Sequence, residues 1–388
     1  MRFQITMGLR AVIATGLFLL SAASIVYVLF GYPLLLAVLS RHERRPVERR
    51  FEPRRVSILL PVWNGEPWIR QKLESIAALD YPRELVEVIV ISDGSTDRTE
   101  QIVREFSGVR LITLPRGGKA LALNAGLEEA GGEILFFTDV RQQLDPSALR
   151  SLVECFADPS VGVASGELVI LRGARSEEAD VGLYWRYEKW IRERLSRIDS
   201  VIGATGAIYA MRRELAKPMP PETLLDDVFL PLAAFFQGYR VILDRRARAY
   251  DYPTSLDSEF RRKVRTLAGN YQLLGFYPEL LGPRNRMWFH YVSHKFGRLM
   301  LPFALLLLLA VSFGLPGGWG RVAVLAQTVF YAAAALDLAV PQGLRVKRLT
   351  SIVRTFVVLQ AAALCAISFF FVGPGSLWRQ TRVGKAQP

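Results

Sequence analysis

The sequence predicts an α/β domain with a mostly parallel sheet, joined to helices that span a membrane. Two observations predict this fold class. From residue 56 to about residue 150, short runs of aliphatic and β-branched residues alternate with longer stretches of helical spacing, which is typical of βαβ units. Before and after the polar middle of the chain lie apolar runs of the length that a bilayer core requires, about 20 residues.

Each element of the α/β domain follows from its local pattern. Apolar runs at 56–61, 86–91, 109–114 and 133–138 predict strands, and helical spacing is found at 66–79, from 95, at 119–130 and from 145. Asp97 and Glu100 are spaced as a capping pair at a helix start. Pro146 stands where Pro is favoured in the first turn of a helix. The alternation predicts parallel strands connected by helices.

The composition excludes several classes of protein. Of 388 residues, 51% are hydrophobic and 22% are charged, which is too apolar for a disordered chain. Two Cys far apart in the sequence provide neither a disulfide framework nor a Cys-rich zinc site, and three His argue against a His-based metal centre. A bound metal would have to be a hard cation held by carboxylates.

The net charge of +13 fits a nucleic acid, an anionic membrane surface or an anionic substrate as partner. Seven arginines directly follow the first apolar run: Arg41, Arg44, Arg45, Arg49, Arg50, Arg54 and Arg55. Arginine beside an apolar span marks the cytoplasmic side of a membrane. A lipid bilayer therefore accounts for much of the charge, and we expect no nucleic-acid partner.

The first apolar run, Ala11–Leu39, holds no charged residue. A cleaved signal peptide is the alternative interpretation, but its apolar core would be shorter and a small-residue cleavage site would follow. The length of the run and the arginines after it favour a retained anchor. Three later runs lie at about 299–315, 322–340 and 352–372. Asp337 and Arg354 lie near span ends, where their side chains can reach the membrane interface.

The positive-inside rule places residue 41 onward inside, which predicts a multi-pass protein of the inner membrane with a cytoplasmic domain. Arg379, Arg382 and Lys385 in the tail argue against the outside C-terminus that this threading gives. We expect five parts: a transmembrane anchor at 1–40, a cytosolic domain at 41–250, interfacial helices at 251–297, three transmembrane helices at 298–373 and a tail at 374–388.

Polar residues follow three of the predicted strands. Asn64 and Glu66 follow the first, Asp93 ends the second, and Asp139 follows the fourth. Ligands of open α/β sheets bind at the carboxyl ends of the strands, so the pattern predicts a nucleotide-type ligand there. The glycines and Lys119 before the next helix suit a diphosphate.

Each of these motifs also has a simpler interpretation. The segment from Asp93 is equally well a turn and helix cap, and the loop before Lys119 is equally well a surface loop. Asp226 and Asp227 are a helix cap or a general base beside a second acid that raises its pKa. His290 and His294 have metal-ligand spacing, but no third ligand is near in the sequence, and the aromatic residues around them favour an interfacial helix.

Taken in order, these motifs resemble those of the family 2 glycosyltransferases, in particular the membrane branch that contains cellulose, chitin, hyaluronan and poly-N-acetylglucosamine synthases. The resemblance covers about Arg55 to Gln272. The matching segments are Pro61-Val-Trp63-Asn64-Gly-Glu66, Ser92-Asp93-Gly-Ser-Thr-Asp97, Gly118-Lys119 through Leu127, Gly203-Ala-Thr-Gly206 and Asp226-Asp227-Val-Phe-Leu230. Several degenerate motifs in the family's order are a stronger signal than any one of them.

The resemblance implies a GT-A fold and an inverting glycosyltransferase. Such an enzyme moves a sugar from a nucleotide sugar, here most simply a UDP-sugar, to a hydroxyl of a glycan or lipid acceptor in the synthesis of a cell-surface polysaccharide or glycolipid. By the same resemblance Asp93 contacts the base or ribose, Lys119 the diphosphate or uridine, and Asp139 the metal or sugar phosphate. Asp227 is the catalytic base with Asp226 beside it, and the substrate-binding set also includes Pro61, Trp63, Asn64, Glu66, Arg141, Gly206 and Arg265.

Two positions depart from the family's pattern. The Asp-x-Asp metal motif falls at Asp139-Val140-Arg141, so that its second acid is replaced by Arg141. Of the Gln-x-x-Arg-Trp motif of processive synthases, only Arg265 is present. Dependence on Mg²⁺ or Mn²⁺ and processive polymerisation therefore stay open. So does an alternative function, a catalytically impaired membrane protein that binds nucleotide sugar or polymer without transfer.

Overall fold

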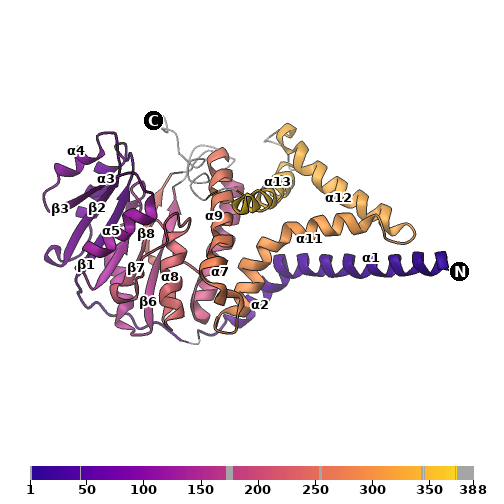
Figure 1. Ribbon diagram of the computed structural model, residues 1–388, viewed down its shortest axis with the longest axis horizontal. Helices are drawn as coiled ribbons and strands as arrows, with labels where there is room; N and C mark the ends of the chain where they lie inside the picture. The colour runs from indigo at the N-terminus through magenta and orange to yellow at the C-terminus, as the bar shows by residue number, and fades with distance from the viewer. Residues whose placement is uncertain are drawn as a thin grey trace.

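The computed structural model describes residues 2–43, 45–171, 178–252, 256–341, 344, 346–371 and 373. A domain built on one β-sheet lies at one end of the molecule, and an arm of long helices extends from it (Figure 1). The tail expected at 374–388 lies outside the described residues.

The sheet has eight strands in the order β3-β2-β1-β4-β7-β6-β8-β5. Their bounds are β1 Val56–Val62, β2 Val86–Asp93, β3 Val109–Leu114, β4 Ile134–Phe137, β5 Gln143–Leu144, β6 Val161–Ile170, β7 Tyr209–Arg212 and β8 Arg240–Asp251. The first four in chain order pair in parallel, β7 is antiparallel to both of its neighbours, β8 is parallel to β6, and β5 is antiparallel to β8. The sheet is thus mixed and mostly parallel.

Helices accompany the sheet as the alternating pattern predicts. They are α3 Ile69–Ala77, α4 Thr99–Arg104, α5 Lys119–Glu129, α6 Ala148–Glu154, α7 Glu178–Ile198, α8 Asp226–Phe236 and α9 Leu256–Phe276. The predicted capping pair does not form. Asp97 accepts a hydrogen bond from the Thr99 N–H at 3.0 Å, whereas Glu100 pairs with Arg104 along the helix.

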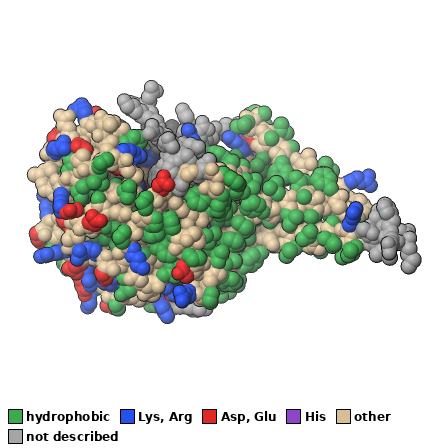
Figure 2. All heavy atoms as spheres, in the orientation of Figure 1, with side chains coloured by type: hydrophobic (Ala, Val, Ile, Leu, Met, Phe, Trp, Pro, Cys, Tyr) green, Lys and Arg blue, Asp and Glu red, His purple; other side chains and the backbone are tan. Residues whose placement is uncertain are grey.

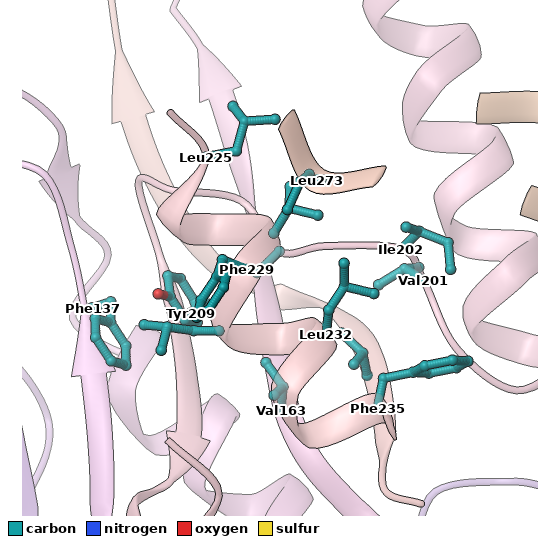
Figure 3. Packing of buried hydrophobic residues seen from close by; sticks show 14 of the residues in the cluster. Phe137, Val163, Val201, Ile202, Tyr209, Leu225, Phe229, Leu232, Phe235 and Leu273 are labelled. Atoms are coloured by element: carbon teal, nitrogen blue, oxygen red, sulfur yellow. The ribbon is translucent and has the colours of Figure 1, made fainter. Parts of the chain in front are cut away.

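The side chains of β1 explain why both faces of the sheet are covered. Ile58, Leu59 and Leu60 are fully buried, and they alternate between two hydrophobic clusters on opposite faces. Full burial of one such side chain contributes about 1.5–3 kcal/mol. On one face, Phe137 of β4 stacks on Tyr209 of β7 with ring centroids 4.5 Å apart, and α8 packs nearby (Figure 3).

The helical arm carries the apolar runs. Its helices are α1 Arg2–Val26, α2 Tyr32–Leu39, α11 Gly297–Ser312, α12 Trp319–Leu336 and α13 Val346–Cys365. Within the described residues, four segments are long and apolar enough to cross a membrane: Leu9–Leu39, Trp288–Ser312, Trp319–Ala339 and Val346–Phe370. Hydrophobic side chains cover the visible face of the arm, while charged side chains gather over the sheet domain (Figure 2).

The sequence suggested that the side chains of Asp337 and Arg354 each reach the membrane interface. In the structure they instead contact each other. Asp337 is completely buried between α12 and α13, where the Lys347 ammonium lies 3.1 Å and the Arg354 guanidinium 3.4 Å from its carboxylate. The Thr350 hydroxyl donates a hydrogen bond to the same carboxylate at 2.6 Å. The polar groups near these two span ends satisfy one another.

Candidate active site

A cavity of about 1620 Å³ opens at the carboxyl ends of β1, β2 and β4. Its wall continues along α7, α8 and α9 and reaches α13 in the helical arm. All twelve residues that the sequence singled out for the site line this cavity: Pro61, Trp63, Asn64, Glu66, Asp93, Lys119, Asp139, Arg141, Gly206, Asp226, Asp227 and Arg265.

Asn64 and Glu66 join the loop after β1 to the loop after β2. The Asn64 side chain accepts a hydrogen bond from the Thr96 N–H at 2.8 Å, and its backbone is left-handed with φ +49°. The Glu66 N–H donates to Asp97 at 3.1 Å, and Glu66 in turn accepts from the Arg98 N–H at 3.2 Å. These contacts hold the predicted strand ends together.

Asp93 organises the loop that precedes α5. Its carboxylate accepts hydrogen bonds from the N–H groups of Gly117 at 2.7 Å and Gly118 at 2.9 Å, and it forms an ion pair with Arg116. The Arg116 guanidinium also lies over the Trp63 ring, 4.2 Å from its centroid. Loop 116–118 is therefore a wall of the cavity and not an independent surface loop.

Lys119 lies at the centre of the acidic groups. Its ammonium is 2.9 Å from Asp139 and 2.9 Å from Asp226. Burial acts to lower the pKa of Lys119, but the carboxylates of Asp139, Asp226 and Asp227 together raise it above its usual value. Lys119 therefore stays protonated, and its ammonium lies beside Asp139, which follows the carboxyl end of β4.

Arg141 points neither to solvent nor to Asp139. Its guanidinium lies 2.5 Å from the buried Asp251 at the end of β8, and the Gln142 amide donates to the same carboxylate at 2.7 Å. This ion pair keeps the Arg141 guanidinium away from solvent, because Asp251 would otherwise be buried without a cation.

Asp227 has the environment of a general base. Burial and the neighbouring Asp226 carboxylate raise the pKa of Asp227 to about 6, although Lys119 acts in the opposite direction. The Gly206 N–H donates to its carboxylate at 3.1 Å, and the Ala204 N–H donates to its backbone carbonyl at 2.6 Å. The predicted loop 203–206 therefore positions Asp227.

Two cations that contact loops of the site were not singled out from the sequence. Lys72 of α3 is buried and donates to the Thr138 hydroxyl and to the Gln142 carbonyl, both at 2.6 Å, so it fixes the loop around Asp139. Burial lowers the pKa of Lys72 to about 7, against the influence of Asp139. In the sequence this lysine is indistinguishable from one on a solvated helix face.

The second cation is Arg192 of α7, which lies in a stretch, residues 184–192, that mixes aromatic and cationic side chains. Its guanidinium donates to the Thr205 hydroxyl at 2.8 Å and to the Ser165 hydroxyl at 3.1 Å. Arg192 thereby supports the loop that holds Asp227. In the sequence, the mixture of cationic and aromatic residues at 184–192 was the one feature that could have pointed to Arg192.

Helix α9 brings Arg265 to the acids. Burial lowers the pKa of Arg265, whereas Asp226 and Asp227 act to raise it. Further along α9, Gln272 accepts a hydrogen bond from the Leu224 N–H at 2.8 Å and donates to the Glu222 carbonyl at 3.2 Å. The helix is thus fastened to the segment that leads into α8.

The two histidines of the aromatic segment serve packing. The Tyr32 hydroxyl and His290 Nδ1 are 3.1 Å apart, and the Tyr32 ring stacks on His294 at 6.0 Å. Over the described ranges, no group of three or more His, Cys, Asp or Glu side chains is arranged to hold a metal. A metal at Asp139 would meet one acid of the expected motif and the Lys119 ammonium beside it.

Residues 57–219 match the sequence profile of the family described as Glycosyl transferase family 2. This segment of the chain is a family 2 glycosyltransferase domain. It contains all of β1 except Val56, strands β2 to β4, the loop 203–206 that contacts Asp227, and every predicted site residue before α8. The expected family and the GT-A-like fold are confirmed.

Relatives of the family 2 domain carry related names. The chain is 27% identical over 246 residues to "Probable glycosyltransferase YdaM" of Bacillus subtilis, covering 57% of each chain. It is 24% identical over 264 residues to a poly-beta-1,6-N-acetyl-D-glucosamine synthase of Staphylococcus epidermidis, covering 64% of this chain and 61% of the relative. The chain thus spans somewhat more than half the length of these relatives.

A solved structure shares the fold over nearly the whole chain. It is a mannosyltransferase from Pyrobaculum calidifontis in complex with GDP-Man and Mn²⁺. The TM-score is 0.68 at 23% identity, covering 93% of this chain and 99% of the other. The likeness extends beyond the family 2 domain to the helical arm.

Proposed function

We propose that the protein is an inverting glycosyltransferase that moves a sugar from a nucleotide sugar, most simply a UDP-sugar, to a hydroxyl of a glycan or lipid. The main support for this proposal is that Asp227 lies in the same cavity as Lys119 and the loop held by Asp93. The raised pKa of Asp227 suits a general base. The family 2 match and the relatives' names support this class of reaction.

In this mechanism the acceptor hydroxyl gives its proton to the Asp227 carboxylate as its oxygen attacks the anomeric carbon. The bond between that carbon and the diphosphate oxygen breaks with inversion, and the diphosphate leaves with the bonding electron pair. Positioned base catalysis contributes about 10²–10⁴-fold to the rate. Lys119 lies where it can stabilise the negative charge of the leaving group.

A divalent cation belongs to this proposal through Asp139, because one structural neighbour was solved with Mn²⁺ and a nucleotide sugar. When bound, such an ion would neutralise diphosphate charge. Within the loop 139–141, Asp139 is the one acid that could bind the ion. The third residue, Arg141, is a cation and is paired with Asp251. The ion would have to take its remaining ligands from phosphate and water.

The proposed location is the inner membrane, with the family 2 domain in the cytoplasm. The four candidate spans and the arginines after the first of them support it. Cytoplasmic placement also gives the cavity access to nucleotide sugars made inside the cell. Product would be a cell-surface polysaccharide or glycolipid.

The test uses the purified full chain in lipid nanodiscs with a panel of UDP- and GDP-sugars and a membrane lipid extract as acceptor source. We expect release of nucleoside diphosphate with one donor and a sized glycosylated product. Asp227→Asn is the matched inactive control. Tight binding of a donor without turnover, under all conditions, would instead support the alternative of a binding protein without transfer.

A further inference from the structure

The residues that line the cavity differ between its donor end and the end near the helical arm. Its wall there is formed by α7, α9, the turn before α11, and α13, and Leu359 and Ala363 of α13 belong to a candidate membrane span. At the opposite end the same cavity holds Asp93 and Lys119. One continuous space therefore joins the donor end of the site to a helix that the bilayer would surround.

Cations dominate the wall between these two ends. Helices α7 and α9 and the segment 294–298 give it Arg192, Arg262, Lys263, Arg265, Lys295 and Arg298. The one acid that these described segments add is Glu188, which already forms an ion pair with Arg298 and lies 3.8 Å from His294. Among the described lining residues of these segments, six cations therefore stand against one acid.

Lys295 is the cation best placed to meet a ligand. In the described part of the chain no acid lies within ion-pair distance of its ammonium. It interacts electrostatically first with Glu188, and then with Arg192, Arg298 and Asp227. An anion bound at Lys295 would meet this group of cations in the cavity that Asp227 also lines.

We infer that this end of the cavity binds the acceptor, and that the acceptor is a membrane lipid whose headgroup carries a phosphate or diphosphate linked to a sugar. The inference rests on the proposed function. Phosphate oxygens accept charge-assisted hydrogen bonds from ammonium and guanidinium groups. The lipid chain follows the apolar residues of α13, and the sugar hydroxyl reaches Asp227.

Binding is measured first, so that the outcome does not depend on turnover. The probes are a prenyl diphosphate-linked N-acetylglucosamine and an alkyl N-acetylglucosaminide of equal chain length, which lacks the diphosphate. Each is titrated into the full chain in detergent micelles. We expect the diphosphate probe to bind at least about tenfold more tightly, as loss of one charge-assisted contact changes affinity by about that factor.

The variants then locate the anion site. Lys295→Gln should weaken binding of the diphosphate probe about tenfold and leave the neutral probe unchanged, and Lys295→Arg should restore most of the affinity. Lys217→Gln, an exposed cation away from the cavity, is the matched control. Equal binding of both probes, or equal effects of Lys295→Gln on both, would overturn the inference.

Turnover separates this inference from the proposed function. If the diphosphate probe binds through Lys295 but no nucleotide sugar is consumed, the lipid site stands and the transferase proposal fails. If sugar is transferred with equal kcat/KM to both probes, the transferase proposal stands and the lipid phosphate site fails.

Discussion

Asp227 combines a raised pKa with a backbone donor aimed at its carboxylate. The Gly206 N–H fixes one oxygen, and burial with the Asp226 charge makes the group a better proton acceptor than a solvated aspartate. These are the conditions in which a carboxylate can deprotonate a hydroxyl near neutral pH.

Asp227→Asn should reduce transfer by about 10²–10⁴-fold while the donor dissociation constant changes little. The amide keeps the shape of the side chain but cannot take the acceptor proton. Transfer is measured as nucleoside diphosphate release, and donor binding by calorimetry. A variant that retains near-native turnover would remove Asp227 from the role of base.

The pH profile should report the same carboxylate. Transfer needs ionised Asp227, so kcat/KM should fall as the pH drops through about 6, the raised pKa. Asp226→Asn removes the like charge that raises this pKa, and its acid limb should move to lower pH. The measurement compares the pH midpoint of the acid limb between the native chain and Asp226→Asn, and it does not compare their maximal rates. An unchanged midpoint in the variant would mean that Asp226 does not tune the base.

At the scale of elements, the loop 203–206 and α8 form one unit. A Cβ on Gly206 would lie 3.0 Å from the Asp227 carboxylate oxygen and would displace it. Gly206→Ala should therefore lower kcat by at least about tenfold, with the donor KM nearly unchanged. Gly275→Ala in α9 is the matched control, because a Cβ there meets nothing within 4 Å.

If Gly206→Ala turns over normally, the loop does not set the position of the base. Should both variants lose activity together, a general effect of adding a methyl group would explain the result better than the contact with Asp227.

The pair formed by the loop after β4 and the end of β8 offers a test of metal use. Exchanging the charges, Arg141→Asp with Asp251→Arg, restores the family's second acid and keeps an ion pair between the two elements. We expect the exchanged chain to bind Mn²⁺ with bound donor about tenfold more tightly than the native chain, because a carboxylate joins Asp139 as ligand.

Mn²⁺ titration calorimetry in the presence of donor measures this difference, and Arg141→Gln separates loss of the cation from gain of the acid. Equal Mn²⁺ affinity in the native and exchanged chains would show that position 141 does not control the metal.

The sequence predicted the first half of the sheet well because each of those strands is a short segment rich in aliphatic and β-branched residues. The run 109–114 coincides with β3, and 56–61 falls one residue short of β1. Strands β6, β7 and β8 were not named in advance, since their order in the sheet depends on pairings between distant segments. Period and propensity describe only local structure.

The site was predicted where motifs are contiguous and missed where it is assembled from separate helices. Asp93, Lys119 and Asp227 were found through motifs. Lys72 and Arg192 act through contacts with Thr138 and Thr205, which lie far away or on another element. The residue type alone does not show whether a lysine is buried or solvated, because burial depends on the surrounding fold.

For the whole molecule, the proposed orientation in the membrane can be tested by cysteine labelling. In a chain with Cys365→Ser, Arg50→Cys should react with an impermeant maleimide only after cells are permeabilised, because the arginine segment is expected inside. Gly318→Cys, in the turn between α11 and α12, should react in intact cells. Labelling of Arg50→Cys in intact cells would reverse the topology.

In the proposed reaction, the double pairing of Lys119 would also affect product release. To bind a diphosphate fully, the Lys119 ammonium would have to loosen its contacts with Asp139 and Asp226. Part of the donor's binding free energy would then be used to separate these ion pairs. When the nucleoside diphosphate leaves, the two carboxylates would pair with the ammonium again. Re-formation of these ion pairs would compete with rebinding of the product and would thereby limit product inhibition.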